Sequence, residues 1–114
     1  MALPDLSQTL ADLERSLASI EAVVDVPAKQ AQIAVLEEEV AAPDLWNDQE
    51  NAQRVTSRLS SLQADVTRVL GLRSRLDDVQ VLIELAEEEG DADSAAEAES
   101  DVKRLAADIS TLEV

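Results

Sequence analysis

The sequence of 114 residues contains no cysteine, histidine, phenylalanine or tyrosine, and it has only two glycines. Without histidine and cysteine, the usual ligand sets for zinc, copper and haem cannot be built, so we expect no cofactor and no metal site. The same absence excludes Ser-His-Asp and Cys-His catalytic arrangements and cysteine redox chemistry. Two glycines allow few tight turns, which disfavours hairpin-rich β architectures.

Basic residues are also few, and acidic residues dominate the charge. Nine Lys and Arg stand against 25 Asp and Glu, which gives a net charge of −16 at pH 7. Binding to a phosphate backbone depends on Lys and Arg, so no direct nucleic-acid readout is expected. A single tryptophan cannot form a platform for stacked bases. Because no long apolar run and no signal-peptide pattern are present, we expect a cytoplasmic protein without a membrane segment.

Apolar residues recur at alternating spacings of three and four along most of the chain, which is the heptad seam of packed helices. The hydrophobic fraction is 46%, and nearly all of it is Ala, Leu, Val and Ile. The pattern predicts an all-α fold, either an elongated helical bundle or an antiparallel coiled-coil hairpin, of about four helices with one long central helix. We expect a single domain over residues 1–114, with helices at about 5–23, 27–42, 48–89 and 92–113.

Capping residues and chain breakers indicate where the helices end. Asn47, followed three residues later by Glu50, has the spacing of a capping box at the start of the long helix. Asp91 or Ser94 can cap the last helix, which must fold back on the long helix because the link at Gly90 is short. We expect the first two helices to pack on the N-terminal half of the long helix and the last helix on its C-terminal half.

The apolar stripe of the long helix moves to a neighbouring row near Gly71. Leu62 and Val69 continue one row, whereas Leu72 and Val79 belong to the adjacent row. Such a drift follows from a helical repeat of 3.6 residues set against a strict repeat of 3.5. The two halves of the long helix are therefore expected to face different partners.

Three arginines, Arg54, Arg68 and Arg75, share one heptad position on the long helix. They form a candidate interaction stripe for an acidic or RNA-containing partner. The alternative is an intramolecular role, in which they neutralise neighbouring acidic helices. The many carboxylates also form close pairs, but acid–base catalysis needs a pocket that raises one pKa. A narrow helical bundle has no obvious place for such a pocket, so we expect no enzyme activity.

The segment between the second and third expected helices contains the only aromatic residue, Trp46. Pro43, Asp44 and Trp46 form a candidate structural plug that fixes the angle between these helices. The alternative is a hot spot for a binding partner, because tryptophan is enriched at such sites.

Several runs of residues resemble the N-terminal region of bacterial class-I peptide chain release factors. They are Val-Pro-Ala-Lys at 26–29, Leu-Glu-Glu-Glu at 36–39, Ala-Pro-Asp-Leu-Trp-Asn-Asp at 42–48 and Ala-Gln-Arg-Val at 52–55. The stretch 85–91 is similar to a helix-ending turn of the same region. The Pro-Asp-Leu-Trp block favours the factor 2 branch, and the resemblance covers residues 5–114.

The resemblance implies a role in translation termination, in which factor 2 reads the stop codons UAA and UGA on the ribosome. In the family, codon reading uses a Ser-Pro-Phe tripeptide and hydrolysis of peptidyl-tRNA uses a Gly-Gly-Gln loop. Neither motif occurs in this sequence. We therefore expect a fragment in which the codon-reading and hydrolysis domains, and all catalytic residues, are absent. The resemblance implies as partners the stalk base of the large ribosomal subunit and the class-II release-factor GTPase.

A free-standing acidic coiled-coil adaptor, or another structural protein, is the alternative function. Apolar seams that a larger protein normally covers would also let the isolated chain form a homodimer.

Overall fold

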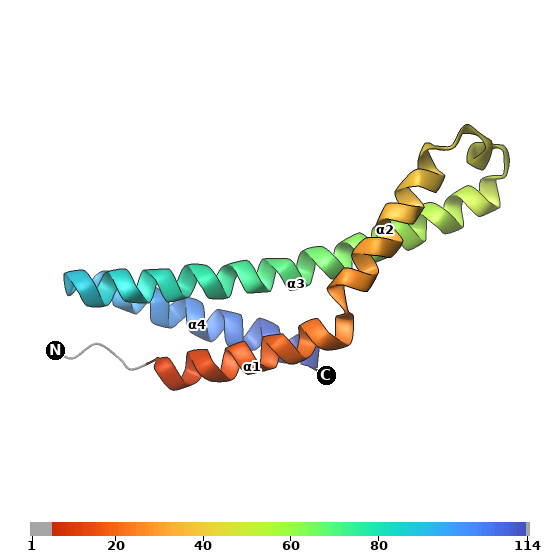
Figure 1. The fold of residues 1–114 in the computed structure, drawn as a ribbon. Coiled ribbons are helices and arrows are strands. Elements are labelled where there is room, and N and C mark those ends of the chain that lie inside the picture. Colours follow the sequence, from red (N-terminus) through yellow and green to blue (C-terminus); the bar gives the residue numbers. More distant parts are fainter. Residues whose placement is uncertain (1–5, 114) are drawn as a thin grey trace. The chain divides into compact units, whose positions relative to one another are not determined.

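The computed structural model describes residues 6–113, which form four α-helices and one short 3₁₀-helix (Figure 1). The elements are α1 (Ser7–Val24), α2 (Val26–Ala41), η1 (Pro43–Asn47), α3 (Gln49–Glu89) and α4 (Ala92–Glu113). No strand occurs among these residues. The prediction of an all-α fold with one long helix is confirmed, since α3 alone contains 41 residues.

The observed helix ends lie near the predicted ones. The helix expected at about 27–42 runs from Val26 to Ala41, and the helix expected at about 48–89 runs from Gln49 to Glu89. Residue 5, the expected start of the first helix, lies outside the described residues. The segment expected as a plain turn before α3 forms the 3₁₀-helix η1.

Close packing of the backbone divides the chain into two compact units. The three-helix unit contains residues 6–20 and 70–113 of the described chain, and the hairpin unit contains residues 21–69. Helix α3 contributes its second part to the three-helix unit and its first part to the hairpin unit. The predicted single domain over residues 1–114 thus consists of two units.

In the three-helix unit, α1 and α4 both run antiparallel to the second part of α3 (Figure 1). Gly90 reverses the chain between α3 and α4 with a φ of 64°, a conformation that glycine adopts without a steric penalty. The core of this unit is entirely apolar. Its buried residues are Leu13, Leu17, Ile20, Leu72, Leu76, Val79, Ala86, Ala95, Ala98, Val102, Leu105 and Ile109.

Helix α1 packs on a different part of α3 from the part that we expected. Glu14 of α1 accepts a hydrogen bond from Arg73, and α1 shares its unit with residues 70–113. The expectation that the first helix packs on the N-terminal half of the long helix is therefore wrong. The reason is that this part of α3 has two apolar rows, one with Leu72 and the other with Leu76, and a single partner helix covers only one row.

Asp91 is the residue that caps α4. Its carboxylate accepts hydrogen bonds from the backbone N–H groups of Asp93 and Ser94, at 3.0 and 3.2 Å, and from the hydroxyl of Ser94 at 2.8 Å. The bond from the Ser94 hydroxyl is the main cause that lowers the pKa of Asp91 below the usual aspartate value. Because folding favours the ionised form, Asp91 stabilises the fold above its unfolded pKa. This contribution is lost as the pH falls through the lower pKa of the folded state.

In the hairpin unit, α2 runs antiparallel to the first part of α3, and η1 joins them at the tip (Figure 1). Asp25 starts α2 from a left-handed conformation with a φ of 55°, and its side chain accepts the N–H of Ala28 at 3.3 Å. Pro27 fits the first turn of α2 because the N–H groups there have no partner within the helix.

Helix α3 is capped by Asp48 and not by Asn47, so the predicted capping box is wrong by one residue. The backbone N–H of Asn51 donates to the carboxylate of Asp48 at 3.2 Å. Asp48 has the extended backbone that an N-cap requires, with φ −118° and ψ 100°. Asn47 is the last residue of η1, so Asp48 is the residue that precedes α3.

Two glycine substitutions test the backbone of α3 and its end. A Cβ at Gly71 would meet no atom within 4 Å, so Gly71→Ala should raise the free energy of unfolding by about 1 kcal/mol through helix propensity. A Cβ at Gly90 would also meet no atom within 4 Å, but the φ of Gly90 is positive. Gly90→Ala should therefore lower the free energy of unfolding by about 1 kcal/mol. Urea unfolding measures both changes, and the opposite sign for either variant contradicts this account.

Candidate interaction surfaces

The three arginines of the candidate interaction stripe have different surroundings. Arg54 donates to the side-chain oxygen of Asn51, and Arg68 is exposed, both within the hairpin unit. Arg75 belongs to the three-helix unit, where its Nη1 lies 2.7 Å from a carboxylate oxygen of Asp108. Arg75 therefore has the intramolecular role that the sequence left open. A partner role for the stripe stays a prediction.

Two other arginines of α3, outside the candidate interaction stripe, connect it to neighbouring helices. Arg58 donates to the side-chain oxygen of Gln32 on α2 at 3.2 Å. Arg73 donates to Glu14 on α1. Arg73 continues the heptad row of Leu59 and Val66, which is a signal that it faces another helix. The sequence gives no such signal for Arg58, which meets Gln32 of α2.

The turn between α2 and α3 is held by Leu45 and not by a buried Trp46. Leu45 is only 9% exposed and lies in a cluster with Ala52 and Val55, whereas Trp46 is 56% exposed. A 3₁₀-helix has three residues per turn, so neighbouring side chains point about 120° apart and only one of the two can face the cluster. The candidate plug of Pro43, Asp44 and Trp46 stays a prediction, and the buried side chain at this turn is that of Leu45.

The other residues of the turn shape the backbone. Pro43 occupies the first turn of η1, and Asp44 lies in the same turn. The indole N–H of Trp46 donates to the carbonyl oxygen of Val40 at 3.2 Å, which ties η1 to the last turn of α2. Trp46 thus fixes the turn through a hydrogen bond while most of its ring faces solvent.

A groove runs between α2 and α3 in the hairpin unit. It consists of two adjoining hollows of about 670 and 330 Å³ that share Leu36 and Arg58. We call it the hairpin groove. Its other lining residues are Ala31, Gln32, Val35, Glu39, Ala42, Asp44, Leu45, Asn51, Arg54 and Val55.

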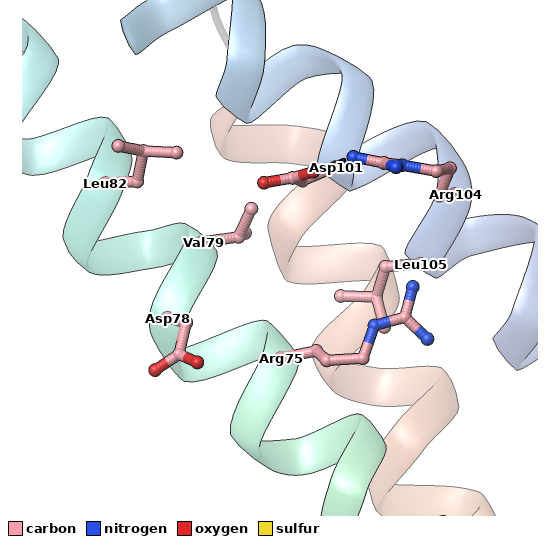
Figure 2. A pocket seen from close by; sticks show the side chains of 7 residues that line it. All are labelled: Arg75, Asp78, Val79, Leu82, Asp101, Arg104 and Leu105. Carbon is pink, nitrogen blue, oxygen red and sulfur yellow. Dashed lines mark hydrogen bonds and ion pairs between the residues drawn. The ribbon is translucent and has the colours of Figure 1, made fainter.

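A second hollow, of about 500 Å³, lies between α3 and α4 in the three-helix unit (Figure 2). Its apolar wall is formed by Val79, Leu82 and Leu105, and charged side chains stand at its rim. Asp101 forms an ion pair with Arg104, as the dashed line in Figure 2 shows. Arg75, which also lines this hollow, forms its ion pair with Asp108.

Neither a metal centre nor a membrane span is found in the part of the chain that the structure describes. No group of three or more acidic side chains there could hold a metal ion. No helix between residues 6 and 113 is both long enough and apolar enough to cross a membrane.

A family model described as the PCRF domain matches residues 29–114. The chain belongs to the PCRF domain family. It is 50% identical over all 114 residues to peptide chain release factor 2 of Streptomyces avermitilis, and 54% identical over 110 residues to that of Acidothermus cellulolyticus. The resemblance to release factors, and to factor 2 among them, is thereby confirmed.

The chain is much shorter than these relatives. The match to the Streptomyces protein includes all of this chain, and the match to the Acidothermus protein includes 96% of it. These matches cover only 31% and 30% of the two relatives themselves. A third relative, peptide chain release factor 2 of Rhodococcus jostii, is 50% identical over 111 residues, 97% of this chain and 30% of that protein.

Two truncations distinguish the roles of Leu45 and Trp46. Leu45→Ala removes a buried side chain and should lower the free energy of unfolding by about 2–3 kcal/mol. Trp46→Phe keeps an exposed ring but removes the donor to Val40, so it should cost about 1 kcal/mol. Chemical unfolding of both variants measures these changes. A larger loss of unfolding free energy for Trp46→Phe than for Leu45→Ala would contradict the assignment of Leu45 as the main packing residue of the turn.

Proposed function

We propose that this chain acts in translation termination as the N-terminal helical domain of a peptide chain release factor 2, the factor that the resemblance links to the codons UAA and UGA. The observation that carries the proposal is the 50% identity over all 114 residues to a relative of that name. The match covers 31% of that relative, so these residues supply one part of a longer protein's activity.

The part supplied by these residues is positioning and interaction, without catalysis. The sequence has no phenylalanine and no adjacent pair of glycines, so it holds neither the Ser-Pro-Phe nor the Gly-Gly-Gln motif. The side chains also support this role, because every buried residue between positions 6 and 113 is apolar. Carboxylates that stay on the surface lack the desolvation that tunes an acid for catalysis.

The proposed partners are the stalk base of the large ribosomal subunit and the class-II release-factor GTPase, and the proposed compartment is the cytoplasm. Charge supports contact with basic proteins over contact with bare RNA. From residue 81 onward the sequence has 11 acidic and 2 basic residues, a net charge of −9. Such a surface is repelled by phosphates and attracted to basic protein surfaces. Within the hairpin unit, Arg54 and Arg68 of the stripe are exposed and could contact RNA or an acidic partner.

Cosedimentation with ribosomal subunits tests this proposal. The chain is expected to pellet with large subunits and not with small subunits. The double variant Arg54→Glu/Arg68→Glu should weaken this binding about tenfold, because it reverses two charges of the stripe.

A matched control reverses two other exposed cations, in Arg15→Glu/Lys103→Glu, whose side chains are 72% and 76% exposed. It has the same net charge as the stripe variant and should change the affinity less than about twofold. Equal binding to both subunits would refute the ribosomal role. Equal weakening by the two double variants would refute only the stripe.

A further inference from the structure

Helix α2 is incompletely covered by the rest of the hairpin unit. None of its 16 residues is buried, and the Val35 side chain is 56% exposed. Val35 lines the hairpin groove together with Leu36 and Ala31, and Leu45 and Val55 extend this apolar floor toward the turn. From residue 31 to residue 42 the groove follows about 16 Å of helix, which is three helical turns.

The two edges of the hairpin groove carry opposite charges. Glu39 of α2 and Asp44 of η1 line one side of the groove, and Arg54 and Arg58 line it from α3, with the Arg58 guanidinium reaching Gln32 of α2. Arg54 and Arg58 are held by neutral oxygens of Asn51 and Gln32, so their charges are not cancelled by those contacts. A ligand that complements this groove needs an apolar face with a basic group on one side and an acidic group on the other.

We propose that the hairpin groove binds one amphipathic helix of a partner protein, with an apolar stripe, a basic flank and an acidic flank. The apolar stripe lies on Val35, Leu36 and Leu45, as in other helix-in-groove complexes. The basic flank faces Glu39 and Asp44, and the acidic flank faces Arg54 and Arg58. This proposal concerns the chemistry of the bound helix, and it does not depend on the ribosomal role proposed above.

The charge around the groove favours a protein helix over a nucleic acid. Helices α2 and η1 contain four acidic residues and one basic residue, so the α2 and η1 side of the groove repels phosphates. The opposed edges also fix the direction of a bound helix, because reversing it exchanges the two flanks and brings like charges together.

Designed peptides of about 15 residues test the proposal by fluorescence anisotropy. All have the same leucine stripe at helical spacing, and their flanks are lysine and glutamate, lysine only, or glutamate only. The lysine–glutamate peptide should bind tightest, and the glutamate-only peptide at least tenfold more weakly. With Arg58→Glu, the lysine-only peptide should become the tightest binder.

Two valine variants show whether the peptide lies in the groove. Val35→Gln should weaken binding about tenfold, because it places a polar group on the apolar floor. Val81→Gln is the matched control, since Val81 is also a helical valine and is 54% exposed, but it lies on the three-helix unit. This control should change the affinity less than twofold, and circular dichroism checks that both variants fold.

Three results would overturn the proposal. One is equal weakening by the two valine variants, and another is binding of the glutamate-only peptide as tight as that of the lysine–glutamate peptide. The third is tighter binding of an RNA hairpin than of any peptide, which would assign the groove to nucleic acid.

Discussion

Burial of the apolar rows of α3 is the interaction on which the other helices depend. Half of the 18 buried apolar residues in the described part of the chain lie on this one helix. Each buried leucine or valine contributes about 1.5–3 kcal/mol relative to an exposed position. No polar or charged residue among 6–113 is buried, so the stability of each unit rests on apolar contacts with ion pairs at their edges. The shift of the apolar stripe near Gly71 gives the two parts of α3 different partners.

The same constraint keeps the charged residues at the surface. With a net charge of −16 and an apolar interior, the chain presents carboxylates and a few arginines to its surroundings. Such a surface is suited to electrostatic contacts with other macromolecules. The chain belongs to the PCRF domain family, and its relatives include peptide chain release factor 2 of several bacteria.

Much of the fold could be predicted from the sequence, because the spacing of apolar residues specifies helices and their buried faces. The burial of Leu62, Val69 and Leu76 follows directly from that spacing. The sequence does not predict features that change with a shift of one residue. Asp48 caps α3 in place of Asn47, and Leu45 is the buried side chain of the turn in place of Trp46. Both depend on η1, and a short 3₁₀-helix leaves no periodic signal. The hairpin groove could not be predicted from the sequence either, because its lining depends on tertiary contacts such as the one between Arg58 and Gln32.

Helix α3 supports two cores, one in each unit. Native-state hydrogen exchange of Leu76→Ala and Leu62→Ala tests it most directly, since these leucines are 0% and 1% exposed and lie in different units. Each substitution should cost about 2–5 kcal/mol in its own core. Leu76→Ala should lower the protection of α4 amides much more than that of α2 amides, and Leu62→Ala should do the reverse. An equal loss in both helices for both variants would contradict the account.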